Sequence, residues 1–314
     1  MRLFVLALMC ACAVAFASDA TPHLTLGVLR ADGLMIPFAS YDGHWSIPWP
    51  TSLRSQTIPI GLDDVDPRWW GAAGPDAAWK AVLQDRTTRP LTLQRLRQVP
   101  VFCTPRLGVQ TDYRGAPGSP QDPTVAKDGL ATAGDVSVLP IERVPKDSRD
   151  WKTTAAAIVA DFNDAEKVAA NSFIRWKHPF KAEQRRTYPI QLETFYRSSE
   201  QTRRGSWRVS YVEAVRNFPA RPEDNGCGLI TYASGWIIER AGKPPRIALR
   251  ARTTYCDRDG VSFIQPFGRV LLHDEVYWVS QMSSWRDEVY TVMRIRPDGV
   301  APALIADGGA CVSR

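Results

Sequence analysis

The chain has 314 residues, of which 44% are hydrophobic, and a formal net charge of +6 at pH 7. The positive charge is spread along the chain without a basic run or an aromatic-basic recognition motif, so we expect no nucleic-acid partner. After the first residues, no window approaches the roughly 20 apolar residues that a membrane-spanning helix needs, so we expect no membrane span.

The first 17 residues have the pattern of a secretory signal peptide. Arg2 supplies a positive charge, residues 3–16 are apolar or small, and Ala15-Phe16-Ala17 is a small-x-small cleavage site. We therefore predict cleavage after Ala17 and a mature protein that is periplasmic or extracellular. The expected organisation is a signal peptide at 1–17, a β-meander region at 18–113, a Pro/Gly-rich loop at 114–124 and a β-rich region at 125–314 that continues the same domain.

The mature region begins with three short apolar strands, expected at residues 24–29, 34–41 and 45–49. The dipeptides Asp32-Gly33 and Asp42-Gly43 separate them and tolerate the positive φ of tight turns. Further Asp-Gly turns are expected at residues 128–129, 259–260 and 298–299. This spacing predicts an antiparallel meander.

Residues 63–70 carry the first candidate ligand site. Trp69 and Trp70 are adjacent in a Pro-Arg-Trp-Trp-Gly loop, and we interpret them as an exposed pair, because tryptophan faces stack on sugar rings. A glycan or another cell-envelope ligand is the partner that such a pair fits. Asp63, Asp64 and Asp66 form an acidic cluster beside it. The alternative is that the tryptophans belong to the core and the acids to a solvated turn.

One segment has helical spacing. Trp151, Ile158 and Phe162 recur at helical intervals, with Ser148 or Asp150 available as N-cap, which predicts an amphipathic helix over residues 150–170. Residues 77–83 fit both a short helix and the beginning of a strand.

The second half of the chain alternates polar and apolar residues with the period of a β-strand. Strands are expected at residues 190–197, 207–215, 229–239, 247–255, 261–264, 269–272, 276–280 and 288–295. Short strands and frequent turns predict a mainly β fold of antiparallel meander sheets, propeller-like, with a β-sandwich as the alternative.

Four cysteines remain after the predicted cleavage. An even number in an exported protein predicts two disulfides. Of the three pairings we favour Cys227 with Cys256, which flank one β-patterned stretch, and Cys103 with Cys311. No pair has the two-to-four-residue spacing of a zinc site.

Acidic residues flank the expected Cys227–Cys256 bridge. Asp224 precedes it, and Asp257 and Asp259 follow it in Asp257-Arg258-Asp259-Gly260, a fragment of the Asp-x-Asp-x-Asp-Gly calcium pattern. These three carboxylates are candidate Ca²⁺ ligands, and no other cofactor is expected. The alternative is a solvated turn beside a disulfide.

Three arginines share one face of the strand expected after Pro244-Pro245. Arg246, Arg250 and Arg252 alternate with apolar residues. Such a row fits a carboxylate or phosphate partner, or the solvated and protected side of a sheet.

Several segments resemble a loosely defined group of exported bacterial β-rich proteins to which no substrate or catalytic residue is assigned. They are Leu29-Arg30-Ala31-Asp32-Gly33 with Pro37-Phe38 and Trp45, Asn225-Gly226-Cys227-Gly228 with Ser234-Gly235-Trp236, Cys256-Asp257, and residues 278–290. The resemblance implies export, β-richness and cysteine pairing.

Common hydrolase and nucleotide-binding motifs are missing from the sequence. We therefore interpret the chain as an exported, disulfide-stabilised binding or interaction module rather than an enzyme. One alternative is a glycan-active hydrolase that uses two carboxylates among Asp63, Asp64, Asp66, Asp257 and Asp259. The other is a calcium-stabilised structural domain.

Overall fold

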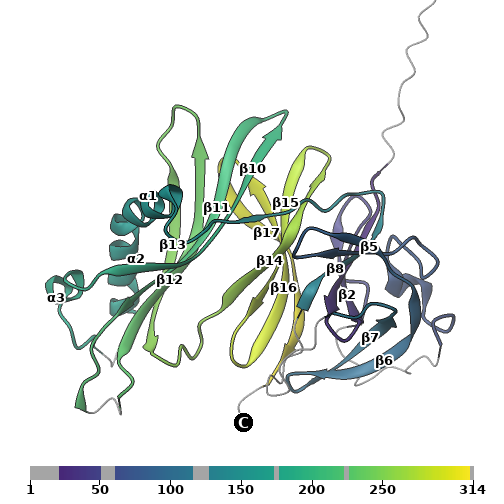
Figure 1. Ribbon diagram of the computed structural model, residues 1–314, viewed down its shortest axis with the longest axis horizontal. Helices are drawn as coiled ribbons and strands as arrows, with labels where there is room; N and C mark the ends of the chain where they lie inside the picture. Colours follow the sequence, from purple (N-terminus) through teal and green to yellow (C-terminus); the bar gives the residue numbers. More distant parts are fainter. Residues whose placement is uncertain (1–20, 51–60, 116–126, 173–176, 223–225, 312–314) are drawn as a thin grey trace, which may run out of the picture.

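Three antiparallel β-sheets stand side by side, and helices cover the outer face of one of them (Figure 1). The computed structural model describes residues 21–50, 61–115, 127–172, 177–222 and 226–311. The predicted mainly β, antiparallel fold class is confirmed. The predicted signal peptide and residues 116–124 of the predicted loop lie outside the described residues.

The N-terminal sheet has the strand order β5-β4-β8-β1-β2-β7-β6, with β3 paired to β2. Its strands are β1 (Leu24–Arg30), β2 (Leu34–Tyr41), β3 (Trp45–Ser46), β4 (Lys80–Leu83), β5 (Thr88–Pro90), β6 (Leu93–Val101), β7 (Thr104–Thr111) and β8 (Lys127–Gly134). Asp32-Gly33 makes the predicted turn between β1 and β2, since Gly33 has a φ of +82° and its N–H donates to the carbonyl of Arg30. Residues 77–83, which fit both a short helix and the beginning of a strand, contain strand β4 at their end, so the strand interpretation is the right one.

One predicted turn is wrong. Asp128-Gly129 lies inside β8, where the glycine serves a close approach of two strands instead of a reversal. A Cβ on Gly129 would lie 2.1 Å from the carbonyl oxygen of Val82 in β4. An Asp-Gly dipeptide alone does not distinguish these two uses of glycine.

The second sheet, here called the helix-covered sheet, has the order β13-β12-β11-β10-β9. Its strands are β9 (Glu142–Arg143), β10 (Ile190–Thr202), β11 (Gly205–Asn217), β12 (Leu229–Arg240) and β13 (Arg246–Tyr255). Each pairs with its neighbour in sequence along most of its length, which is the meander expected for this half of the chain.

Three helices accompany this sheet: α1 (Arg149–Ala157), α2 (Val159–Asn171) and α3 (Ala182–Arg186). The predicted helix over 150–170 is therefore present, divided into α1 and α2 at Ile158. The Ser148 hydroxyl accepts a hydrogen bond from the N–H of Trp151 and caps α1. The predicted stripe of Trp151, Ile158 and Phe162 packs on apolar residues of β10–β12.

The C-terminal sheet is a meander in chain order: β14 (Phe263–Leu272), β15 (Glu275–Ser283), β16 (Asp287–Arg296) and β17 (Gly299–Ala310). It is the middle layer of the molecule, between the other two sheets (Figure 1). In β15, Tyr277 and Val279 join the core shared with the N-terminal sheet, while Val276 and Trp278 pack toward β11. Alternate residues of one strand thus belong to two different cores.

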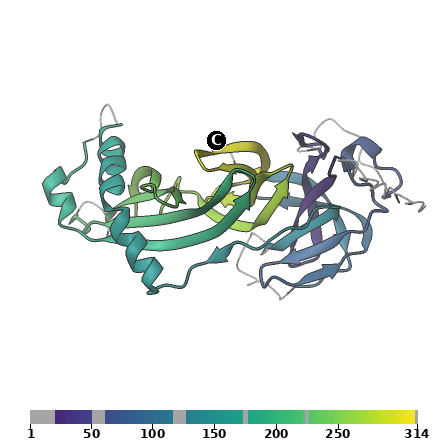
Figure 2. The same cartoon turned by 90° about the horizontal axis from the view of Figure 1, so that it is seen from above.

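Seen from above, the layers follow one another along the molecule, with the helices at one end and the N-terminal sheet at the other (Figure 2). Sheets of eight, five and four strands that pack face to face match the β-sandwich alternative, extended by a third layer. They do not form a ring of equal blades, so the structure does not support the propeller-like arrangement.

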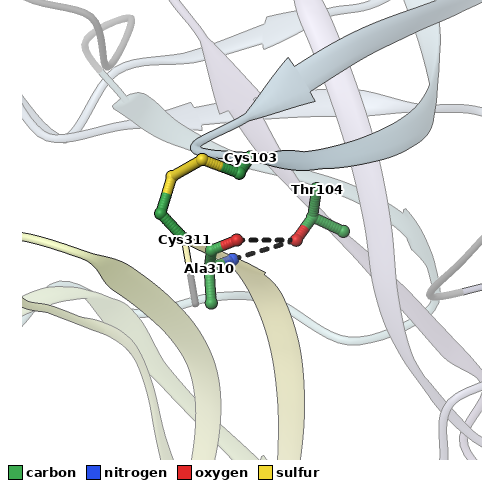
Figure 3. Close-up of a disulfide and its surroundings, with 4 residues drawn as sticks. All are labelled: Cys103, Thr104, Ala310 and Cys311. Atoms are coloured by element: carbon green, nitrogen blue, oxygen red, sulfur yellow. Dashed lines mark hydrogen bonds between the residues drawn. A yellow bond between two sulfur atoms is a disulfide. The ribbon is translucent and has the colours of Figure 1, made fainter. Parts of the chain in front are cut away.

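Both favoured disulfides are present: Cys103 is joined to Cys311, and Cys227 to Cys256. The first links the turn between β6 and β7 to the residue that follows β17 (Figure 3). Beside it, the Thr104 hydroxyl donates to the carbonyl of Ala310 and accepts from its N–H, at 3.1 and 3.0 Å. The bridge and these bonds connect the N-terminal and C-terminal sheets at one edge of their interface.

A buried ion pair also connects these two sheets. Lys127 of β8 and Glu288 of β16 lie 2.7 Å apart, and neither side chain is more than 5% exposed. Gln281 and Tyr290 also donate to the Glu288 carboxylate. The interface therefore contains a hydrogen-bonded polar cluster within an otherwise apolar core.

Candidate functional site

An apolar cleft of about 560 Å³ separates parts of the helix-covered and C-terminal sheets. Its volume falls within the roughly 300–1,000 Å³ of small-molecule sites. The residues that line it are Tyr211, Ser234, Gly235, Trp236, Ala248, Leu249 and Arg250 from the helix-covered sheet, and Ile264, Ser280, Met282, Thr291, Met293, Val300 and Pro302 from the C-terminal sheet.

Successive side chains of a strand point to opposite faces of its sheet, and most of the lining side chains lie on the sheet faces that border the cleft. Tyr211 in β11 and Trp236 in β12 are paired residues, and so are Ser234 and Arg250 in β12 and β13. Paired residues of neighbouring antiparallel strands project from the same side of the sheet. The side chains on the opposite face of this sheet pack under the helices instead.

Aromatic rings make up one wall of the cleft. The ring of Trp236 lies edge-on to Tyr211, with centroids 5.0 Å apart, and edge-on to Trp278, at 5.1 Å. Trp278 is fixed in turn by its indole N–H, which donates to the Ser198 hydroxyl at 2.9 Å. The half-buried Trp236 is therefore held in place by two buried neighbours while it lines the cleft.

Methionines form part of the opposite wall. Met282 and Met293 are half-buried and come from adjacent strands of the C-terminal sheet. Methionine side chains are flexible and polarisable, and they adapt to ligands of different shape. This wall can accommodate an apolar group without a fixed complementary shape.

Polar groups in and beside the cleft are few and mostly paired. The hydroxyls of Ser280 and Thr291 lie 2.8 Å apart and hydrogen bond to each other. Burial raises the pKa of the Tyr211 phenol. Glu213, two residues further along β11, is buried and accepts from the N–H of Ile264 at 2.9 Å; burial raises its pKa.

A second hollow, of about 610 Å³, lies over the ends of β10, β11 and β12. Three of the charged residues that line it have partners: Arg208 pairs with Glu239 at 2.8 Å, and Glu200 pairs with Arg269 at 2.9 Å, while Arg240 and Lys243 also line it. The cleft between the sheets has a mainly apolar lining, whereas the second hollow is lined mostly by polar and charged residues, so we take the cleft as the candidate site.

The tryptophan pair predicted from the sequence is not an exposed pair. Trp70 is only 1% exposed and packs between Trp49 and Trp79 on the N-terminal sheet. Trp69 is half-buried and contacts Trp49 edge-on. Both tryptophans lie in the short 3₁₀-helix η1 (Pro67–Trp70), whose tight turn directs Trp70 into the core. The predicted exposure is therefore wrong for Trp70, and ligand binding by this pair remains a prediction.

The predicted calcium site is only partly within the described residues, because Asp224 lies outside them. Asp257 and Asp259 are exposed at the turn after β13, and the Asp257 carboxylate accepts from the N–H of Asp259. Arg286 lies 3.5 Å from Asp259, while Arg258 pairs with Glu193. Among the described residues no group of three or more His, Cys, Asp or Glu side chains is placed to hold a metal ion. Calcium binding remains a prediction.

The acidic cluster before η1 has local structural roles. Asp64 accepts from the N–H of Gly61, and Asp66 caps η1 and binds Arg68. Hydrogen bonds from Arg68 lower the pKa of Asp66 to about 2. Asp66 therefore stays ionised at neutral pH and does not have the properties of a general acid.

The sequence reasoning missed most of the cleft. Trp207, Trp236 and Trp278 all lie within predicted strands, which is typical of core residues; Trp207 and Trp278 are buried, whereas Trp236 lines the cleft. The sequence of β15 does carry one indication of a second interface: its consecutive apolar residues predict a strand that is buried on both faces. These residues do not indicate that a cleft remains at one of the two interfaces.

No family model matches the chain, and comparisons with curated proteins and with solved structures find no match either. Within the described residues, no helix has the length and apolarity to cross a membrane.

Proposed function

We propose that this protein is an exported binding protein that holds an apolar ligand in the cleft between its helix-covered and C-terminal sheets. The cleft itself carries this proposal. Aromatic and methionine side chains line it, its volume suits a small ligand, and its few polar groups fit the role of orienting one. The two disulfides agree with an oxidising compartment.

The lining residues supply contact surface, hydroxyl groups and one guanidinium. Trp236 and the two methionines offer dispersion contacts, and Ser234 offers a half-buried hydroxyl. This set of groups is suited to binding. Glycan hydrolysis, in contrast, needs two suitably placed carboxyl groups, and the lining residues named above include no Asp or Glu.

The test is a titration of the purified oxidised protein with Nile red, a neutral dye that becomes fluorescent in apolar surroundings. We expect saturable binding at one site. Ala248 is exposed and lines the cleft beside Trp236, with which it is paired across β12 and β13, so it can be enlarged without disturbing the core. Ala248→Phe should weaken dye binding about tenfold or more, because the new ring occupies the ligand's space.

The matched control is Ala157→Phe, which places the same ring at an exposed position of α1 away from the cleft. Thermal melting of both variants should match the wild type. The proposal is wrong if the dye does not bind, or if Ala248→Phe and Ala157→Phe bind it equally.

A further inference from the structure

Three arginines lie on the cleft side of β13, the edge strand of the helix-covered sheet. Arg246, Arg250 and Arg252 pair with Ile238, Ser234 and Tyr232 of β12, respectively. Those partners face the C-terminal sheet, and Arg250 lines the cleft directly. The row predicted from the sequence therefore lies along one margin of the apolar cleft.

These guanidiniums have no acidic partner among the described residues. All three side chains are exposed and make no ion pair there, and Arg250 is the one charged residue among those that line the cleft. Most other arginines near this interface are paired, as Arg258 is with Glu193 and Arg269 with Glu200. The cleft therefore combines an apolar interior with uncompensated positive charge at its margin.

We infer that the ligand is a single-chain amphiphile with an anionic headgroup. This inference rests on the proposed function, because it assigns a chemical class to the ligand of the same cleft. The chain would lie against Trp236, Met282 and Met293, and the headgroup would accept charge-assisted hydrogen bonds from Arg250, supported by Arg252. A carboxylate or a phosphate ester meets this requirement equally, since both accept from a guanidinium through two oxygens.

Protection of an exposed strand edge is the competing role for these arginines. If the arginines only protect the edge, positive charge along β13 is needed, but ligand affinity does not depend on that charge. Another edge strand offers a control, because Arg95 is exposed on β6, one of the two edge strands of the N-terminal sheet, and makes no ion pair among the described residues.

The experiment measures displacement of Nile red by oleate, oleyl alcohol and oleylamine, three ligands with the same chain, each below its aggregation concentration. Wild-type protein should bind oleate about tenfold or more tightly than the alcohol at low salt, and the amine weakest. The preference for oleate should decrease as ionic strength rises, because the mouth of the cleft is solvated. Lysophosphatidic acid, tested in the same way, shows whether a phosphate headgroup is preferred to a carboxylate.

Three variants separate the roles. Arg250→Ala should remove most of the advantage of oleate by weakening oleate binding much more than alcohol binding, and Arg250→Glu should favour the amine. Arg95→Ala should behave as the wild type. Equal binding of oleate and alcohol by the wild type, or equal behaviour of Arg250→Ala and Arg95→Ala, would overturn the inference while Nile red binding upholds the proposed function. Absence of dye binding overturns both.

Discussion

Lys127 Nζ and Glu288 Oε2 lie 2.7 Å apart between the N-terminal and C-terminal sheets, and both side chains are almost completely buried. A pair of this kind contributes little net stability, because desolvation of both charges offsets their attraction. Removing only one of the two charges lowers the free energy of unfolding strongly, because the remaining charge is buried without a partner.

Lys127→Met should therefore lower the free energy of unfolding by about 3–5 kcal/mol. Lys127→Met combined with Glu288→Gln should be clearly more stable than Lys127→Met alone, since no charge is left unpaired. Arg208→Met, which breaks the exposed pair with Glu239, should cost less than about 1 kcal/mol. Urea denaturation measures all three; similar losses for Lys127→Met and Arg208→Met would contradict the prediction.

The two disulfides should differ in their contribution to stability. Cys103 and Cys311 are 208 residues apart in the sequence, and Cys227 and Cys256 only 29. Restriction of the unfolded chain grows with loop length, so replacing the first pair with serine should cost about 2 kcal/mol more than replacing the second. Thermal melts of the two double-serine variants provide the comparison, and a larger loss for the shorter loop would show that native contacts outweigh chain entropy.

Glu213 should make stability fall as the pH rises. Burial raises the pKa of its carboxyl above the ordinary 4.5, so the folded protein holds this proton at a pH where the unfolded chain has released it. Stability is then lost as the pH rises from 4.5 through the folded-state pKa. Glu213→Gln, which keeps an acceptor for the N–H of Ile264, should gain stability relative to the wild type over that interval. A constant difference between the two proteins from pH 4 to pH 8 would refute this.

His178 should act in the opposite direction. Its ring packs against Phe180 and Phe218, and burial lowers its pKa from 6.5 to about 4. Between these values the unfolded chain binds a proton that the folded protein excludes, so stability falls as the pH decreases from about 6.5 to about 4. His178→Gln should remove this part of the pH dependence in denaturation measured at pH 7 and pH 5, whereas an unchanged dependence would assign it to other groups.

The adjacent tryptophans should respond differently to truncation. Trp70 is buried among Trp49 and Trp79, so Trp70→Ala should cost about 3–5 kcal/mol. Trp69 is half-buried, and Trp69→Ala should cost clearly less. Thermal-shift screening of Trp69→Ala against oligosaccharides also tests the sugar-binding prediction, which fails if no sugar stabilises the wild type.

Much of the fold was predictable, because its strands follow simple local patterns. Three local patterns each predicted one local conformation: the turn at Asp32-Gly33, the alternation in β10 and β11, and the helical stripe through Phe162. The predicted strands 261–264 and 269–272 are one strand, β14, interrupted by an irregularity between Pro266 and Gly268 that resembles a break in the sequence.

Strand β17 was missed for a physical reason. It is rich in alanine and glycine, which have low strand propensity, and its conformation depends on its neighbours. A Cβ on Gly308 would lie 2.7 Å from the Glu288 side chain, so a small residue is needed there to pack against β16. The cleft was equally hidden, because an unfilled space between two sheets depends on tertiary packing, which strand periodicity does not report.

The position of the C-terminal sheet as the middle layer has a consequence for biogenesis. During synthesis the two outer sheets emerge before β14–β17, and each then exposes an apolar face whose partner has not yet been made. Incomplete chains with exposed apolar faces and unpaired strand edges are prone to aggregate. Chaperones that keep the chain unfolded until its last strands are available should therefore raise the yield of this protein.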